Sequence, residues 1–595
     1  MGIRFFADMH IHPQGRSFNY FRNNPERITQ IEAGIPKEWS PWVLPPRDGL
    51  PKNWKRQSEG KRPGCFSQAD FNRLAAGNVR LVFASLYPLE SGFVRGKDPT
   101  GFGKIMHTLL KPISFIAENN DLRALAQSLQ MRYSVDRIRF FQGRTKEVFD
   151  YWEETKLEYY FLAARDGIKQ THTFNYFAHE CLGTALDENG FPQEQLDEYQ
   201  FKLDHQYEII QSKTHLTALL DTQIPGKPIH DNKTIAVVLT IEGGHVFSMN
   251  GDNVMLDWEI IKSRLLELKN WGKKQSSQVA SSVDLKDVPA LKKWIEQANG
   301  TNVSHPIFII NLSHHFNNYL AAHARSLPDK LRLIMDQSPG IINGLAVTDV
   351  GRKVIELCLG IKRIEVNNKI TFEKTNFGKR ILIDVKHLNP RARAIYYEEY
   401  IVPYNTLFPE DLIPVVATHV GVVGSTYQTL AELKKQEIVS LAEDLVKRNT
   451  SRDGFTLWGI NMCLEDIKVV CQSRGIIALS IDQRILGNPS GKSSAVDFVR
   501  NLLYIITESQ RNKFVSEKAG NSIWDCISVA SDFDGFIDPI DSCPSVMHYD
   551  KLLIDVKALL KEKPEEFFGP YTLDQSMEKV FGLNAYHFVK THFPE

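Results

Sequence analysis

Short apolar runs that end in polar or turn-forming residues recur along the whole chain. Runs of this length and composition predict buried strands. We expect eight of them, over residues 3–8, 79–87, 234–241, 306–312, 380–385, 413–417, 475–482 and 526–530. Most are separated by helical or irregular sequence, and this alternation predicts a parallel sheet. Eight such strands predict an α/β fold, a closed (β/α)8 TIM barrel.

Three stretches between the early strands are too long for ordinary barrel connections. Residues 14–75 form an irregular, tryptophan- and proline-containing stretch after the first strand. Residues 103–223 show helical spacing of apolar residues, and residues 246–303 follow the third strand with a polar segment. We expect one barrel over residues 1–595 that carries these stretches as large, mainly helical insertions. Long connections are often functional lids, although a solvent-exposed loop without a function would have the same sequence pattern.

Acidic residues and histidines stand at the ends of most of the expected strands. Glu242 follows a buried run and precedes Gly243 and Gly244, so it is costly unless a positive group meets it; the alternative is a helix cap. His10 and His12 lie two apart in an extended segment and can grip one cation together. The carboxyl ends of barrel strands form a single rim. Seven side chains are therefore expected in one mouth: His10, His12, Glu242, His314, His387, His419 and Asp532.

Residues of these types can hold two divalent ions that share one carboxylate. Imidazole and carboxylate suit zinc, and also manganese, iron or cobalt. Two ions that share a carboxylate can bridge a hydroxide at neutral pH, which would attack a carbonyl polarised by one ion. Asp532 is the best candidate to carry the proton to a leaving amine. His314 could hydrogen-bond the developing oxyanion.

Composition and charge narrow the class of protein. Lysine plus arginine equals aspartate plus glutamate, 71 each, which gives no reason to expect nucleic acid or an anionic membrane as partner. The seven cysteines contain no CxxC pair, which disfavours a disulfide framework and a zinc ribbon. Neither a signal peptide nor a membrane span is evident. We expect a cytoplasmic protein with a small-molecule substrate, and a homo-oligomer is possible.

Six short motifs resemble the membrane (renal) dipeptidase family, peptidase family M19 of the amidohydrolase superfamily. They are residues 8–12, 241–245, 312–314, 383–387, 418–419 and 531–535, and residues 580–584 resemble that family's last motif. The resemblance implies a metallopeptidase with two metal ions, usually zinc. One ion would be bound by His10, His12, Glu242 and Asp532, the other by Glu242, His387 and His419. His314 would contact the substrate, a dipeptide.

Two departures from the family pattern leave the substrate open. The first strand carries His10-Ile11-His12 where the family usually has His-x-Asp, which should still bind metal. The family also places an arginine before an asparagine to hold the substrate carboxylate, and no arginine directly precedes Asn461. An amidohydrolase acting on a non-peptide amide, cyclic amide or lactone is therefore the alternative. A non-catalytic scaffold whose insertions bind a partner is less favoured.

One further motif resembles a nucleotide-binding site without matching its spacing. Residues 487–493 resemble a phosphate-binding P-loop but are one residue short of its spacing, so we expect an ordinary loop after the seventh strand.

Overall fold

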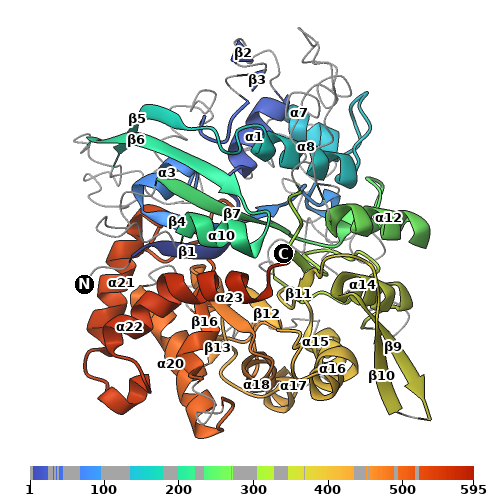
Figure 1. Cartoon of the computed structure of the whole chain (residues 1–595), viewed down its shortest axis with the longest axis vertical. Coiled ribbons are helices and arrows are strands. Elements are labelled where there is room, and N and C mark those ends of the chain that lie inside the picture. Colours follow the sequence, from blue (N-terminus) through green and yellow to red (C-terminus); the bar gives the residue numbers. More distant parts are fainter. Residues whose placement is uncertain are drawn as a thin grey trace, which may run out of the picture.

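The eight expected strands form a nearly closed parallel barrel (Figure 1). The computed structural model describes residues 4–23, 31–32, 35–36, 39–43, 67–94, 135–177, 198–220, 233–269, 271, 304–326, 346–367, 369–434, 451–452, 454–487, 494–515, 521–535 and 537–595. The strands are, in order around the sheet, β1 (Phe6–Ile11), β4 (Val79–Leu86), β7 (Thr234–Ile241), β8 (Ile309–Asn311), β11 (Leu382–Asp384), β12 (Val416–Val420), β15 (Ile476–Leu479) and β16 (Ile527–Val529). This confirms the TIM-barrel prediction.

The barrel closes where the end of β1 meets the residues after β16. The backbone N–H of His12 donates to the carbonyl of Phe533 at 3.0 Å, and the N–H of Asp532 donates to the carbonyl of His10 at 2.9 Å. These two bonds bring the first and last strand ends together. They also place His10, His12 and Asp532 side by side.

Both faces of the barrel strands are buried, which explains their continuous apolar runs. Along β4 and β7 every residue is buried, and successive side chains alternate between the barrel interior and the layer beneath the helices. Leu81, Phe83 and Val238 belong to the interior cluster, whereas Val82 and Val237 belong to the outer core. The interior cluster continues into α23 (Asn584–His592), which follows the π-helical turn η12 (Lys579–Leu583).

Helices follow most of the strands in the second half of the chain. They are α14 (Asp349–Leu359), α15 (Pro390–Tyr396), η6 (Tyr397–Ile401), α16 (Val402–Leu407), α17 (Tyr427–Lys434), α18 (Leu464–Gln472), α19 (Gln483–Leu486), α20 (Ala495–Arg511), α21 (Tyr549–Leu560) and α22 (Leu573–Glu578). A hairpin of β9 (Ile361–Val366) and β10 (Lys369–Lys374) stands beside α16 (Figure 1). The expected P-loop-like stretch falls largely on residues 488–493, outside the described residues.

The stretches between the early strands contain both helices and strands. Their helices are α1 (Gly15–Asn23), α3 (Phe71–Ala76), α7 (Val135–Phe141), α8 (Tyr151–Ala163), α10 (Lys213–Leu220), α11 (His245–Ser248) and α12 (Trp258–Lys269). The strands are the short pair β2 (Ile31–Glu32) and β3 (Ile35–Pro36), and the antiparallel pair β5 (Gln170–Phe177) and β6 (Glu198–Ile209). Residues 95–134, 178–197 and 272–303 of these stretches lie outside the described residues.

The β5–β6 hairpin was not predicted from the sequence. β6 also pairs in parallel with β7 and so extends the barrel sheet outward. Its sequence does carry a strand signal, because Leu203, His205, Tyr207 and Ile209 are buried at alternate positions. The helical spacing of α8, earlier in the same stretch, predicts helix and hides this period-two pattern.

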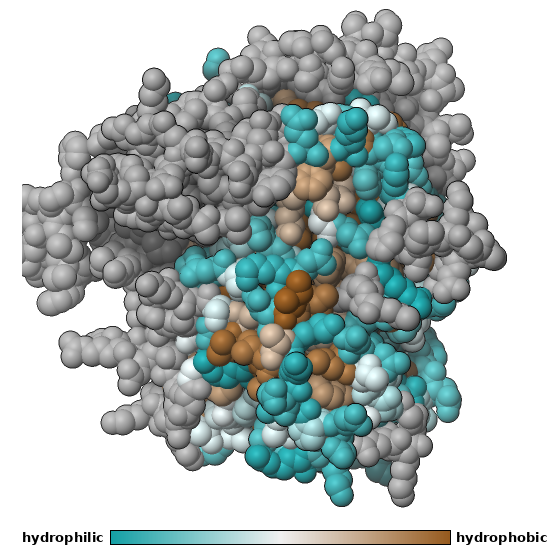
Figure 2. Space-filling view, turned by 90° about the vertical axis from the view of Figure 1, so that its left-hand side faces the viewer, coloured by the Kyte–Doolittle hydropathy of each residue, from teal (hydrophilic) through white to brown (hydrophobic). Residues whose placement is uncertain are grey.

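The described surface is mixed in character. On the face shown in Figure 2, hydrophilic side chains separate several small hydrophobic groups. Within the ranges that the structure describes, no helix has the length and apolar character needed to cross a membrane.

Candidate metal centre

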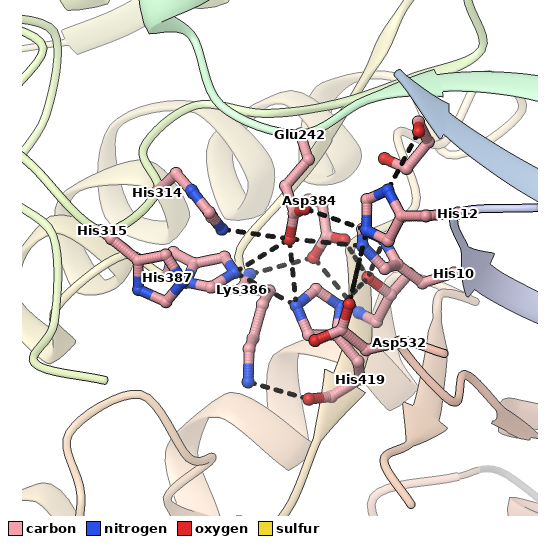
Figure 3. Close-up of polar contacts among 12 residues, drawn as sticks. His10, His12, Glu242, His314, His315, Asp384, Lys386, His387, His419 and Asp532 are labelled. Carbon is pink, nitrogen blue, oxygen red and sulfur yellow. Dashed lines mark hydrogen bonds and ion pairs between the residues drawn. The ribbon is translucent and has the colours of Figure 1, made fainter. Parts of the chain in front are cut away.

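All seven side chains expected at the barrel mouth converge on one point (Figure 3). Each stands in the carboxyl end of a barrel strand or within three residues after it. Glu242 occupies the centre, with the imidazoles around it. Six of the seven are buried, and the side chain of Asp532 is 18% exposed. The set comprises His10, His12, Glu242, His314, His387, His419 and Asp532.

One group of ligand atoms lies between the first and last strands. His10 Nε2 is 3.2 Å from Glu242 Oε1, and His12 Nε2 is 3.2 Å from Glu242 Oε2. Asp532 Oδ1 lies 3.9 Å from His10 Nε2 and 3.4 Å from His12 Nε2. Four potential ligands from three separate parts of the chain therefore face one another.

A second group lies on the other side of the same carboxylate. His387 Nε2 and His419 Nε2 are 3.3 Å and 3.5 Å from Glu242 Oε1, and 3.1 Å from each other. Within each group one ligand atom per residue lies within 4.8 Å of the others. Glu242 is common to both groups, so its two oxygens could bridge two cations.

The donor atoms fit divalent cations better than they fit one another. His10 Nε2 and His12 Nε2 lie 3.2 Å from Glu242 oxygens but not in hydrogen-bond geometry, so both are buried without a hydrogen bond, which is costly unless a ligand satisfies them. Imidazole nitrogens with carboxylate oxygens are the ligands that zinc and similar metals take in proteins. Two overlapping groups, His10–Asp384–His419 and His314–His315–His387, also meet the distance criterion.

Two of these histidines are oriented by hydrogen bonds that their Nδ1 atoms, on the side of the ring away from the centre, donate. His12 Nδ1 donates to the carbonyl of Ser85 at 3.1 Å, and His419 Nδ1 donates to the hydroxyl of Thr418 at 2.9 Å. The hydroxyl of Thr418 in turn donates to Asp384. These partners favour the tautomers that leave both Nε2 lone pairs toward the centre.

Two buried carboxylates hold neighbouring strand ends together. Asp8 accepts hydrogen bonds from the backbone N–H of Ser531 at 3.0 Å and from its hydroxyl. Asp384 accepts from the backbone N–H of Thr418 at 3.2 Å and from its hydroxyl. Burial raises the pKa of both carboxyls, while these hydrogen bonds oppose the rise. Each hydroxyl partner directly precedes a candidate ligand, so the pattern fixes Asp532 and His419.

Several candidate ligands have a strained backbone. The φ angles of His387, His419 and Asp532 are 69°, 39° and 62°, in the left-handed region that residues other than glycine rarely adopt. Such conformations cost about 1–3 kcal/mol and persist where the surroundings impose them, often at functional sites. Gly243 has φ 99°, and a Cβ there would lie 2.4 Å from His245 Nδ1. That contact explains one glycine of the Glu-Gly-Gly-His motif.

The charges around Glu242 are arranged to keep it ionised. Burial raises the pKa of Glu242, but His314 and His10 outweigh this effect and hold it well below its usual range. Burial lowers the pKa of His314, yet Glu242 and Glu90 raise it to about 9. Burial and the neighbouring cations lower the pKa of His387 and His419, so both are neutral and able to donate a lone pair.

Glu90, which contacts His314 from the loop after β4, was not predicted from the sequence. A buried acid shortly after the second strand was a possible signal, but Pro88 and Leu89 separate it from the strand end. Its contact with His314 spans 224 residues and no local pattern reveals it.

No arginine directly precedes Asn461 in the sequence, but Arg393 reaches this segment from elsewhere in the fold. It does not take the place of an arginine that binds a substrate carboxylate. Arg393, from α15, pairs with Asp466 through two nitrogens at 2.8 and 3.0 Å and donates to the carbonyls of Gly459 and Asn461. Arg393 is 1% exposed, and these contacts occupy its guanidinium, so it is not available to bind a substrate carboxylate. Arg448 lies outside the described residues.

Comparisons with known proteins find only distant structural likenesses. No family model matches the chain, and no curated protein matches it. Similar solved structures include a dipeptidase of metallopeptidase family M19, with 12% identity, 99% of each chain covered and a TM-score of 0.43. Another is a metallopeptidase from Rhodobacter sphaeroides liganded with a phosphinate mimic of the dipeptide L-Ala-D-Ala (11%, 100% of each chain, 0.42). A third is the probable dipeptidase PvdM from Pseudomonas aeruginosa (10%, 98% of this chain and 94% of that chain, 0.39). Likenesses at this level carry no information about the substrate of this chain.

Proposed function

We propose that this chain is a metal-dependent hydrolase with two metal ions that cleaves the amide bond of a dipeptide-like substrate. The observation that carries the proposal is the sharing of Glu242 between two groups of ligand atoms. The buried Nε2 atoms of His10 and His12 support it, because they have no hydrogen-bond partner and a divalent cation would satisfy both lone pairs. The dipeptide class comes from the resemblance of the motifs to family M19.

The two groups would hold two divalent cations, for which we propose zinc. His10, His12, Glu242 and Asp532 would hold one, and Glu242, His387 and His419 the other. When bound, such a pair supplies a water of lowered pKa and polarises a carbonyl group.

Two side chains would act on protons and developing charge. Asp532 is the most exposed member of the centre, so it can accept a proton from the attacking water and pass it to the leaving amine. His314 presents Nε2 3.3 Å from Glu242 Oε1, beside the same centre. From there it can donate a hydrogen bond to the oxygen that becomes negative when the carbonyl is attacked.

A non-peptide amide, cyclic amide or lactone is the second candidate substrate class. Arg393 is buried and paired with Asp466, so the free carboxylate of a dipeptide would need another positive group. This favours retaining the second substrate class. A non-catalytic scaffold is less favoured, because the candidate ligand set is complete.

The test is amino-acid release from a panel of L,L and L,D dipeptides by zinc-reloaded protein, with a chelator-treated sample as blank. Glu242→Gln should abolish cleavage and lower the bound zinc below two equivalents. Glu399→Gln is the matched control, since that carboxylate pairs with Arg352 away from the centre. Full activity in Glu242→Gln would contradict the shared-ligand role. Two bound equivalents without dipeptide cleavage would move the substrate to the second class.

A further inference from the structure

Glu90 is a buried carboxylate beside the candidate metal centre, and neither proposed ligand group contains it. It lies four residues beyond β4 and is 3% exposed. Its Oε2 accepts a hydrogen bond from His314 Nδ1 at 2.6 Å and one from the backbone N–H of His315 at 3.3 Å. Its Oε1 accepts from the backbone N–H of Phe316 at 3.1 Å. Both oxygens are therefore used by the segment that follows β8.

The bond to Glu90 fixes where the proton of His314 lies. An ionised carboxylate only accepts hydrogen bonds, so Nδ1 of His314 carries a proton. Charge-assisted bonds of this kind are short and stronger than neutral ones, and burial strengthens this one further. The ring is thereby held with Nε2 toward Glu242.

The rest of the same loop constrains the ring from a second side. The ring of Tyr87 meets that of His314 edge-on, with centroids 4.8 Å apart. The carbonyl of Pro88 accepts a hydrogen bond from His245 Nε2 at 3.1 Å, and Glu90 Oε1 lies 3.8 Å from His245 Nδ1. Residues 87–90 thus contact histidines that follow two other strands, which is the arrangement of an orienting loop.

We propose that Glu90 is a positioning residue that holds His314 protonated at Nδ1, with Nε2 aimed at the reacting carbonyl. This inference rests on the proposed function, in which His314 contacts the substrate. The competing explanation is that Glu90 only closes the backbone of residues 315–316. The two differ in whether loss of the carboxylate acts through the His314 side chain.

A double-mutant cycle with the zinc-loaded full chain separates the two explanations. Glu90→Gln keeps an acceptor oxygen but removes the charge, and it should lower kcat about 100-fold with KM little changed. Bound zinc and the melting temperature should stay near wild type. In a His314→Asn background the same change should have no further effect on kcat. The proposal would be overturned if the kcat of the double variant fell by the product of the two single losses. It would also be overturned if Glu90→Gln alone left kcat unchanged.

A spectroscopic measurement tests Glu90 without any substrate. In protein labelled with nitrogen-15 histidine, His314 should show a strongly hydrogen-bonded Nδ1 proton that disappears in Glu90→Ala. The matched control is Glu158→Gln, since Glu158 is a buried glutamate whose two oxygens accept from the N–H of Tyr87 at 2.9 Å and from the side chain of Gln14 at 3.0 Å. The signal should persist there. Its persistence in Glu90→Ala would refute the positioning role, whereas failure to cleave any amide would refute only the proposed function.

Discussion

Asp384 and Thr418 join two neighbouring strand ends through a backbone and a side-chain hydrogen bond. The hydroxyl of Thr418 donates to Asp384 and accepts from His419 Nδ1 at 2.9 Å. One hydroxyl therefore sets the tautomer of a candidate metal ligand while it is itself oriented by a buried carboxylate. Asp8 and Ser531 form the same pair of backbone and hydroxyl hydrogen bonds directly before Asp532, on the other side of the centre.

Replacement of Thr418 by valine should weaken metal binding at the group that contains His419. Valine keeps the shape of the side chain but removes the two hydrogen bonds of the hydroxyl, to Asp384 and from His419 Nδ1. His419 therefore loses its orientation and tautomer preference. Loss of such an outer partner typically costs 10–100-fold in metal affinity, and we expect about that loss for one of two zinc ions. Competition with a chromophoric chelator measures it. Thr418→Ser keeps the hydroxyl and should bind like wild type; equal affinities for the valine and serine variants would contradict the prediction.

Replacement of Asp532 by asparagine should impair catalysis more than folding. The side chain is partly exposed at the mouth and has a carboxylate oxygen 3.4 Å from His12 Nε2. A missing proton carrier typically costs about 10²–10⁴-fold in rate. We expect that loss in kcat at saturating zinc. Unchanged kcat at full zinc occupancy would remove Asp532 from its proposed role and leave it as a ligand at most.

The buried Lys269 predicts a stability difference that grows with pH. Its ammonium donates to the carbonyls of Cys358 at 3.1 Å and Lys379 at 2.7 Å, and it is 0% exposed. Burial lowers its pKa to about 8, below the value of about 10.4 in an unfolded chain. Between these values the unfolded chain binds more protons. The contribution of Lys269 to the free energy of unfolding therefore rises with pH above 8, by about 1.4 kcal/mol per unit.

Urea unfolding at several pH values checks this prediction. The unfolding free energy of wild type minus that of Lys269→Met should be constant below pH 8 and rise by about 2 kcal/mol between pH 8 and 9.5. Lys262→Met is the control, because Lys262 is on the same helix and pairs with Glu259 at the surface. A difference that stays flat for Lys269→Met, or an equal slope for both variants, would refute the assigned shift.

The barrel and the composition of its mouth could be predicted from sequence because both depend on local signals. Each buried strand is a short apolar run, and each side chain proposed for the centre stands at its end. Contacts between distant segments gave no such signal. The hydrogen bond between Glu90 and His314 and the pairing of β6 with β7 join parts of the chain that only the tertiary fold brings together. The roles of the seven mouth residues stay predictions until metal binding is measured.

The C-terminal helix should contribute to stability by packing against the barrel interior. Phe308 is 0% exposed, and its ring lies 6.0 Å from that of Phe588 and 5.1 Å from that of Phe593, centroid to centroid. Phe308→Ala should lower the free energy of unfolding by about 3–5 kcal/mol, since it opens a cavity among these rings. Phe377→Ala, at a residue that is 38% exposed, should change it by less than about 0.5 kcal/mol.

A double-mutant cycle identifies the partner of Phe308. If the C-terminal helix supplies the packing surface, Phe308→Ala and Phe593→Ala together should cost less than the sum of the two single losses, because both remove the same contact. Denaturant unfolding of the four proteins gives the coupling free energy. Additive losses would show that Phe308 is stabilised by the barrel strands alone, for example through Phe83 at 6.4 Å, and that the helix packs independently of it.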